Sequence, residues 1–199
     1  MRVIAGSAGG VPLRTLDVAG LRPMLDRVKE SMFNILRGHL RDARVLDLFA
    51  GCGSLGIEAL SRGATSCVFV ERDRRLADLI GDNLEKCRLA DRAEILQADV
   101  LKLGQRSATG NLTPASLCFA DPPYAMMEEE AGRKRLFRLL ENIVETWLEP
   151  DCILVLHHPP PGPEQWPTDL FEERDRRTYG RSTLTFFRAR ADQNTEADA

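Results

Sequence analysis

Short apolar runs alternate with helix-like segments along the chain from Val45 onward. A short apolar run bounded by turn residues is typical of a buried strand, and apolar residues repeated every three or four positions indicate a helix. Strand followed by helix, repeated along the chain, predicts a parallel sheet with right-handed crossovers. The expected strands are 45–50, 67–72, 93–99, 117–121 and 152–158, and the expected helices are 55–63, 74–89 and 133–148.

Both ends of the chain depart from this alternation. The segments 170–179 and 182–190 are strand-like, and the short link at Gly180 predicts an antiparallel hairpin. Near the N-terminus, the stretches RVIAGS and PLRTL predict a small hairpin, and 26–36 predicts an amphipathic helix. The fold class is therefore α/β: a doubly wound, Rossmann-like sheet of seven strands, mostly parallel, with an antiparallel C-terminal hairpin and a small N-terminal hairpin and helix. The expected apolar face of the N-terminal helix consists of Val28, Met32, Ile35 and Leu36.

The length of 199 residues suits a single domain with a small extension. We expect an N-terminal hairpin and helix over residues 1–40, the main domain over 41–190, and an acidic, disordered tail over 191–199. No apolar run approaches the roughly 18 residues of a membrane span, and the N-terminus lacks the apolar segment of a signal peptide. We therefore expect a cytoplasmic protein without membrane contact, and a monomer.

The net charge of −3 does not by itself indicate a nucleic-acid-binding protein, but the charge is unevenly distributed. Residues 1–44 carry an excess of four positive charges, and a second basic cluster spans 132–138. On charge alone, a solvated surface is the simpler explanation of both clusters. The five cysteines form no C-x-x-C pair, and neither they nor the three histidines show the spacing of metal ligands. We expect free thiols and no metal site.

A glycine-rich turn follows the first expected strand and opens a helix. Gly51, Gly53 and Gly56 form a G-x-G-x-x-G pattern in this strand–turn–helix context. Glycine allows a ligand to approach the backbone closely, and the N-terminus of the helix offers free N–H groups. Glu71 ends the next strand, 20 residues after Gly51, where a carboxylate can accept both hydroxyls of a ribose. These features suit either a dinucleotide or S-adenosylmethionine (AdoMet).

Asp47 favours AdoMet over a dinucleotide. This acid lies inside the first expected strand, where its charge would repel a pyrophosphate and attract the amino group and sulfonium of AdoMet. The alternative is that Asp47 only braces the loop. Asp99 follows the third expected strand, where it could accept a hydrogen bond from the adenine amino group. The candidate cofactor-binding residues are Asp47, Phe49, Ala50, Gly51, Gly53, Gly56, Glu71, Arg72, Ala98, Asp99 and Val100.

The stretch FADPPYA at 119–125 ends the fourth expected strand, beside the point where the strand order reverses and ligand crevices form. Pro122 and Pro123 lack backbone N–H groups, so this loop presents acceptors, notably the Asp121 carboxylate and the Pro122 carbonyl. Such a site suits an exocyclic NH2 group that donates both hydrogens while its nitrogen attacks the methyl group of AdoMet. Tyr124 can stack on the base that carries the amine. The candidate catalytic residues are Asp121, Pro122, Pro123 and Tyr124.

Nearly the whole chain resembles the RsmD family of guanine-N2 methyltransferases that act on 16S ribosomal RNA (rRNA). The stretches RVIAGSAGGVPL, GLRPMLDRVKESMFNIL, DLFAGCGSLGIEALSRGA, FADPPYA and TYGRSTLTFF resemble, in order, the family's N-terminal hairpin, first helix, cofactor loop, catalytic loop and closing hairpin. The resemblance implies a class I AdoMet-dependent methyltransferase whose partner is 16S rRNA or the assembling 30S subunit.

The same resemblance implies that the N-terminal segment covers the active site and grips RNA. The candidate substrate-binding residues are Arg22, Asp26, Arg27 and Tyr179. On this hypothesis the excess positive charge of residues 1–44 becomes a phosphate-binding face. The expected members of that face are Arg2, Arg14, Arg22, Arg27 and Lys29.

The chain departs from the family pattern at two places. Met24 and Leu25 stand where the family has two threonines, whose hydroxyls are expected near the cofactor and the target base. His157 and His158 stand where a glutamate is expected at the end of the fifth strand. Because methylation of an amine needs no strong general base, we expect these histidines to be loop or RNA-contact residues.

Three other functions stay open at this stage. A DNA adenine-N6 methyltransferase would share the DPPY motif, but it would normally need an inserted target-recognition region, for which 199 residues leave no room. A nicotinamide or other nucleotide-binding enzyme is disfavoured by Asp47 and by DPPY. A non-catalytic RNA-binding assembly factor could keep the same fold; Met24 and Leu25 favour it, whereas the intact Asp121 argues against it.

Overall fold

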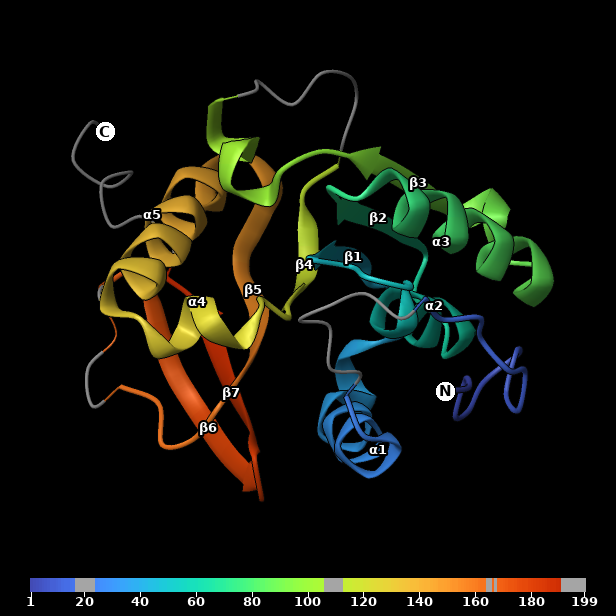
Figure 1. Ribbon diagram of the computed structural model, residues 1–199, viewed down its shortest axis with the longest axis horizontal. Coiled ribbons are helices and arrows are strands. Elements are labelled where there is room, and N and C mark those ends of the chain that lie inside the picture. The colour runs from blue at the N-terminus through green and yellow to red at the C-terminus, as the bar shows by residue number, and fades with distance from the viewer. Residues whose placement is uncertain (17–23, 106–112, 164–165, 167, 191–199) are drawn as a thin grey trace, which may run out of the picture.

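One sheet of seven strands organises the fold, in the order β3-β2-β1-β4-β5-β7-β6 (Figure 1). The computed structural model describes residues 1–16, 24–105, 113–163, 166 and 168–190. Strands β1 to β5 run parallel, whereas β7 is antiparallel to both β5 and β6. The predicted α/β fold class, with its antiparallel C-terminal hairpin, is confirmed. The strands are β1 (Arg44–Leu48), β2 (Ser66–Glu71), β3 (Ala93–Gln97), β4 (Ala115–Ala120), β5 (Leu148–His158), β6 (Phe171–Tyr179) and β7 (Ser182–Ala189).

Helices cover both faces of the sheet. Figure 1 shows α1, α2 and α3 on one side, and α4 and α5 on the other. Each long helix lies within a few residues of its predicted range, but the sequence did not predict α4, which begins directly after the two prolines. The helices are α1 (Asp26–Ile35), α2 (Ser54–Ser61), α3 (Arg74–Cys87), α4 (Tyr124–Glu128) and α5 (Glu130–Trp147), with short 3₁₀ helices η1 (Leu36–His39), η2 (Ala90–Arg92) and η3 (Val100–Gln105).

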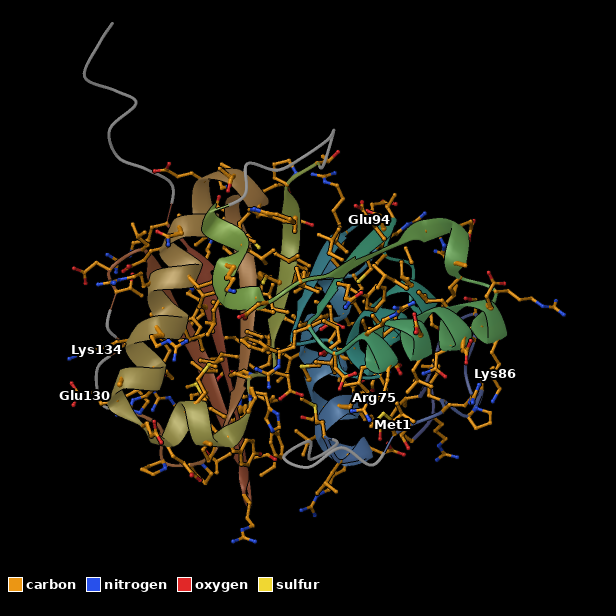
Figure 2. The ribbon with its side chains drawn as sticks, turned by 45° about the horizontal axis from the view of Figure 1, so that its top comes forward. Met1, Arg75, Lys86, Glu94, Glu130 and Lys134 are labelled. Carbon is orange, nitrogen blue, oxygen red and sulfur yellow. The ribbon has the colours of Figure 1, made fainter. Side chains whose placement is uncertain are left out.

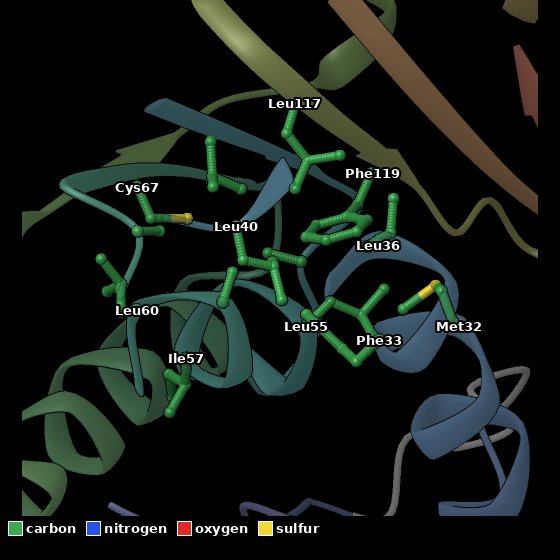
Figure 3. Packing of buried hydrophobic residues seen from close by; sticks show 14 of the residues in the cluster. Met32, Phe33, Leu36, Leu40, Leu55, Ile57, Leu60, Cys67, Leu117 and Phe119 are labelled. Atoms are coloured by element: carbon green, nitrogen blue, oxygen red, sulfur yellow. The ribbon is translucent and has the colours of Figure 1, made fainter. Parts of the chain in front are cut away.

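Each face of the sheet carries its own hydrophobic core. On the side of α1 and α2, Phe33 packs against Phe119 of β4 with ring centroids 5.6 Å apart (Figure 3). On the other side, Phe137 of α5 packs against Phe187 of β7. Alternate residues of the parallel strands enter opposite cores, because helices bury both faces of such a sheet. This double burial explains why the strands are continuous apolar runs in the sequence.

The buried face of α1 differs in part from the prediction. Val28, Met32 and the following Leu36 are buried as expected, but Ile35 is 40% exposed. The face of α1 that packs on the core contains positions 28, 32 and 36 together with the adjacent positions 29 and 33. Phe33 and Lys29 are therefore buried, whereas Ile35 is not.

Gly56 sets the distance between α2 and the sheet. A Cβ atom at this position would lie 2.3 Å from the Phe69 ring and 2.5 Å from the sulfur of Cys67, both on β2. Only a residue without a side chain allows α2 to lie this close to the strand. The third glycine of the G-x-G-x-x-G pattern therefore serves helix–sheet packing.

A buried carboxylate, that of Glu58 on α2, holds the N-terminal segment in place. One Glu58 oxygen accepts the Ile4 N–H at 2.7 Å, and the other accepts the Ala5 N–H at 3.0 Å. The Arg62 Nε atom donates to the same carboxylate at 2.7 Å, and the Lys29 Nζ atom lies 3.5 Å from it. Glu58 is fully buried and Lys29 is 1% exposed, so each charge needs the other as a partner.

Lys29 extends this network toward the start of the chain. Its Nζ atom donates to the Arg2 carbonyl at 2.8 Å and to the Ser54 hydroxyl at 3.1 Å. Burial lowers the pKa of Lys29, while the Glu58 carboxylate opposes that change. The lysine thereby joins α1, α2 and the first residues of the chain at one point.

The predicted N-terminal hairpin forms, although it is short. Arg2 and Pro12 make an antiparallel bridge, and the Val3 N–H donates to the Val11 carbonyl at 3.0 Å. Val3 and Leu13 are buried in the same core as α1 and α2. The boundary at residue 40 stays a prediction. Across the part of the chain that the structure describes, no helix is both long and apolar enough to cross a membrane.

We predict that Lys29→Met lowers the free energy of unfolding by about 3 kcal/mol, because it removes one partner of a buried ion pair. Chemical denaturation measures this loss. The matched control is Lys134→Met, since Lys134 pairs with Glu130 on the exposed surface of α5 (Figure 2). An exposed pair contributes about 0–1 kcal/mol, so equal losses in both variants would contradict a special role for Lys29.

Candidate functional site

A cavity of about 510 Å³ opens at the carboxyl ends of β1, β2 and β4 and beside the loop after β3. Ligand crevices of doubly wound sheets lie at this end of the strands, where the strand order reverses. Here the order reverses between β1 and β4. The lining residues are Met1, Thr15, Leu16, Met24, Asp47, Phe49, Ala50, Gly51, Cys52, Ser54, Leu55, Glu71, Arg72, Asp73, Leu76, Asp99, Val100, Leu101, Asp121, Pro122, Pro123, Tyr124, Ala125, Met126 and Glu128.

Most of the predicted cofactor-binding residues line this cavity. Three do not: Gly53, Gly56 and Ala98 are absent from its wall. Gly53 precedes the first residue of α2 with φ of 80°, in the left-handed region that favours glycine. Gly53 and Gly56 therefore shape the turn and its packing. The predicted residues in the wall are Asp47, Phe49, Ala50, Gly51, Glu71, Arg72, Asp99 and Val100.

The turn between β1 and α2 is strained at the cavity wall. Phe49 has a φ of 60°, which is costly for a residue with a large side chain, and Gly51 has a φ of 57°. The Ala50 N–H donates to the Val70 carbonyl at 3.1 Å, which holds the turn against the neighbouring strand. This conformation exposes the backbone of the turn, from Phe49 to Cys52, to the cavity.

Asp47 both braces the turn and faces the cavity. Its Oδ2 atom accepts the Gly56 N–H at 2.9 Å, which is the bracing role that the sequence left open as an alternative. Burial raises the pKa of Asp47 well above its usual range, and the carboxylates of Asp121 and Glu71 raise it further. Three acids thus share one side of the cavity. Such an arrangement disfavours an anionic ligand and favours a cationic one.

Glu71 links the first turn to the loop after β2. One oxygen accepts the Gly51 N–H and the other accepts the Asp73 N–H, both at 2.9 Å. Each carboxylate oxygen has two lone pairs, so Glu71 keeps acceptor capacity for a ligand at the cavity wall. Asp99 likewise accepts the Leu101 N–H at 3.0 Å while it lines the cavity.

The four predicted catalytic residues form a continuous part of the wall. Asp121, Pro122 and Pro123 follow β4, and Tyr124 is the first residue of α4. The backbone N–H of Asp121 lies 3.4 Å from the Leu48 carbonyl, at the end of the neighbouring β1. The Tyr124 hydroxyl lies 3.1 Å from the Ser182 hydroxyl and 3.2 Å from the Arg181 carbonyl, at the start of β7.

The prediction that His157 and His158 are loop or RNA-contact residues is wrong. Both belong to β5, and they are only 3% and 0% exposed. The Nδ1 atom of His157 lies 2.7 Å from Oδ1 of Asp121, and its Nε2 atom lies 3.1 Å from the Tyr124 hydroxyl. The reason is that β5 continues to the very edge of the cavity, so its last residues pack instead of reaching solvent.

His158 points to the opposite face of the sheet. Its Nε2 atom lies 2.8 Å from the Thr185 hydroxyl, and its Nδ1 atom lies 2.8 Å from the Pro159 carbonyl. The Trp166 ring meets it edge-on, with centroids 5.4 Å apart. Burial lowers the pKa of His158 to about 4, and the nearby Arg176 guanidinium acts in the same direction.

Of the predicted substrate-binding residues, Asp26, Arg27 and Tyr179 lie outside the cavity wall. Arg22 falls outside the described residues. Asp26 pairs with Arg2 across 3.9 Å at the start of α1. The Tyr179 hydroxyl lies 2.5 Å from Ser31 of α1, and the exposed Arg27 approaches Gly180 in the turn between β6 and β7. Helix α1 and this turn therefore lie together.

The predicted phosphate-binding face needs revision. Lys29 cannot belong to it, because its ammonium group is buried against Glu58. Arg14 pairs with Asp82 at 2.6 Å, and Arg2 pairs with Asp26. Arg27 remains exposed beside the β6–β7 turn. Within the described residues, no group of three or more histidine, cysteine or acidic side chains is placed to hold a metal ion.

Sequence patterns missed part of the cavity wall. Met1, Thr15, Leu16 and Met24 come from the N-terminal segment and contribute mostly apolar side chains to the cavity wall. Met24 is 7% exposed, so a thioether lines the cavity at the first of the two positions where the family resemblance leads one to expect threonine. Only the expectation that the N-terminal segment covers the active site pointed to this contribution.

Comparison with known proteins gives concordant results. The sequence profile of the family described as conserved hypothetical protein 95 matches residues 1–188. Ribosomal RNA small subunit methyltransferase D of Haemophilus influenzae is 37% identical over 175 residues, covering 83% of this chain and 84% of that protein. The solved structure of the Escherichia coli candidate methyltransferase yhhF superposes with a TM-score of 0.80 at 29% identity, covering 96% of this chain and 98% of that one.

A more distant structure shares the fold alone. The RNA methyltransferase of Salinibacter ruber, solved in complex with S-adenosyl-L-homocysteine, has a TM-score of 0.62 at 17% identity. The superposition covers 89% of this chain and 100% of the Salinibacter ruber chain.

We predict that acidification between pH 6.5 and pH 4 destabilises the fold through His158. In this range the unfolded chain binds a proton that the folded protein does not, so the free energy of unfolding falls as pH falls. The full effect is about 3 kcal/mol. Urea unfolding of wild type and of His158→Asn at several pH values measures this effect. The free energy of unfolding of wild type, minus that of the variant, should decrease as pH falls. A difference that stays constant across this range would contradict the assignment.

Proposed function

Because the chain belongs to the RsmD family, described as conserved hypothetical protein 95, we propose that it transfers the methyl group of AdoMet to the exocyclic N2 atom of a guanine in 16S rRNA. The observation that carries this proposal is the acidic cavity at the strand ends, with Asp121 beside it on a loop that lacks backbone donors. The fold alone would leave the reaction open.

The charge of the cavity supports AdoMet as the cofactor. Asp47, Glu71 and Asp121 lie near one another, and their mutual repulsion is relieved by a cation. AdoMet brings an ammonium group and a sulfonium, whereas a dinucleotide brings a pyrophosphate. Glu71 and Asp99 both line the cavity; on this proposal Glu71 accepts the ribose hydroxyls and Asp99 accepts from the adenine amino group. The relative from Salinibacter ruber, with its bound demethylated product, shows that this fold admits such a ligand.

Asp121 is proposed to activate the amine. The lone pair of a guanine N2 atom is conjugated with the ring, which makes the nitrogen a weak nucleophile. Hydrogen bonds from its two N–H groups to Asp121 and to the Pro122 carbonyl localise electron density on nitrogen and stabilise its growing positive charge. The nitrogen attacks the methyl carbon, and the carbon–sulfur bond breaks with its electron pair remaining on sulfur.

RNA is the proposed substrate because the relatives that cover most of the chain are named for small-subunit rRNA. A guanine must leave its stack to reach the DPPY loop, and extrusion costs least for an unpaired base. The exposed Arg27, beside the β6–β7 turn, is a candidate for contact with phosphates at that end of α1.

We predict that the protein binds AdoMet and that Glu71→Gln weakens this binding about 10-fold to 100-fold, the loss expected for one charge-assisted hydrogen bond. Isothermal titration calorimetry measures the affinity. Glu94→Gln is the matched control, because Glu94 lies on the exposed surface of β3 (Figure 2). The cofactor assignment fails if wild type does not bind AdoMet, or if both variants bind it equally well.

We predict that wild type methylates guanine N2 in 30S particles from a strain that lacks this gene. Asp121→Ala should lower the rate at least about 100-fold, because it removes a transition-state acceptor, while AdoMet affinity changes less than about 2-fold. The exposed Asp91→Ala serves as control. Tritiated AdoMet and mass spectrometry of nucleosides identify the product.

Each alternative has its own outcome in this assay. N6-methyladenine in duplex DNA, with no label in rRNA, would establish the DNA enzyme. Tight RNA binding without methyl transfer by wild type would establish a non-catalytic assembly factor.

A further inference from the structure

The loop that carries Asp121 has few backbone hydrogen bonds that fix it to the neighbouring strands. Pro122 and Pro123 have no N–H groups, so two successive peptide units offer no donor by which the loop could be fixed to its surroundings. The backbone of Asp121 has a single long contact, 3.4 Å, to the Leu48 carbonyl. The orientation of the Asp121 carboxylate and of the Tyr124 ring must therefore come from other elements.

His157 on β5 contacts both of these side chains. Its Nδ1 atom lies 2.7 Å from Oδ1 of Asp121, and its Nε2 atom lies 3.1 Å from the Tyr124 hydroxyl. The imidazole and the tyrosine ring meet edge to face, with centroids 5.5 Å apart. The imidazole is 3% exposed, whereas 28% of the Asp121 side chain is exposed. A buried group on a rigid strand thus holds two partly exposed groups at the cavity.

The protons of this network can be assigned from the chemistry of its members. An ionised carboxylate only accepts, so Nδ1 of His157 carries a proton and donates it to Asp121. Nε2 is then an acceptor, and the single proton of the Tyr124 hydroxyl is shared between Nε2, 3.1 Å away, and the Arg181 carbonyl, 3.2 Å away. The oxygen of Tyr124 can in turn accept from the Ser182 hydroxyl, 3.1 Å away. Every polar atom of the imidazole is satisfied, and Oδ2 of Asp121 is left for another donor.

We propose that His157 is a positioning residue for methyl transfer, which holds Asp121 and Tyr124 as one unit so that the free Asp121 oxygen meets the amine of the substrate. This inference rests on the proposed function. His157 does not touch the reacting atoms; it acts through the two side chains that do. Misplacement of a catalytic group by about 1 Å can cost 100-fold in rate, and among the described residues His157 is the side chain within hydrogen-bond distance of the Asp121 carboxylate.

Three substitutions separate the two contacts of His157. His157→Phe keeps the ring volume but removes both polar contacts. His157→Asn can place an N–H near the position of Nδ1 and so retain the contact to Asp121. His157→Gln reaches toward the position of Nε2 and so retains only the contact to Tyr124. The matched control is His158→Asn, the neighbouring buried histidine on the opposite face of the sheet.

The expected result is an ordered loss of kcat. In methylation assays on 30S particles, His157→Phe lowers kcat about 100-fold, with KM for the particle and AdoMet affinity changed less than about 3-fold. His157→Asn stays within about 10-fold of wild type, and His157→Gln falls near the Phe variant. His158→Asn lowers thermal stability but leaves kcat within about 2-fold of wild type.

Several outcomes would overturn the proposal. One is a kcat for His157→Phe within 2-fold of wild type; another is an equal loss of kcat in His158→Asn. If His157→Phe does not fold, the test rests on the other two variants. The proposal expects a higher kcat for His157→Asn than for His157→Gln, and a kcat for His157→Asn that is equal or lower overturns it. An inactive wild type would instead refute the proposed function.

Nuclear magnetic resonance tests the contact without activity. A downfield Nδ1 proton of His157 should appear in wild type and be lost in Asp121→Ala, and the absence of that signal in wild type would also overturn the proposal.

Discussion

The buried carboxylate of Glu58 is the constraint on which the arrangement of the cavity depends. A fully desolvated charge must be compensated, and here two backbone N–H groups, one arginine and one lysine do so. Those partners come from the N-terminal hairpin, from α1 and from the C-terminal end of α2, so satisfying one carboxylate brings three segments together. Because Lys29 also holds the Arg2 carbonyl and the Ser54 hydroxyl, the network reaches residues adjacent to the cavity wall. The apolar side of the cavity is thereby fixed against its acidic side.

The cavity itself has two unlike walls. Asp47, Glu71 and Asp121 make one wall acidic, and each of the first two uses a backbone N–H of the glycine-rich turn to hold its position. Met1 and Met24 contribute to the other, mostly apolar wall. A ligand that is cationic at one end and carries an aromatic base fits both walls, which a pyrophosphate ligand does not. The same carboxylates that shape the turn therefore also select the charge of the ligand.

The sequence predicted what depends on local pattern. Buried parallel strands are apolar runs, and the glycine turn and DPPY are short strings, so the strands, the sheet type and nearly half of the cavity wall could be found. Contacts between distant segments left no such signal. His157 lies 36 positions from Asp121, and although the expected strand 152–158 includes it, no local pattern shows that its ring contacts Asp121. From the sequence, Lys29 is expected at the surface. The helical repeat of 3.6 residues per turn shows which residues share a face of α1, but it does not show that Glu58 of α2 packs against that face.

Among the residues that the structure describes, the cavity wall includes none beyond Glu128, whereas the groups that contact the side chains of Asp121 and Tyr124 come from positions 157, 181 and 182. The two tasks are thus divided along the chain. During synthesis from the N-terminus, the ribosome releases every lining residue before it releases the strand that orients the catalytic loop. A nascent chain therefore completes the described cavity wall before it can form the contacts from β5 and β7 to Asp121 and Tyr124, which on the proposed function are the contacts that methyl transfer requires.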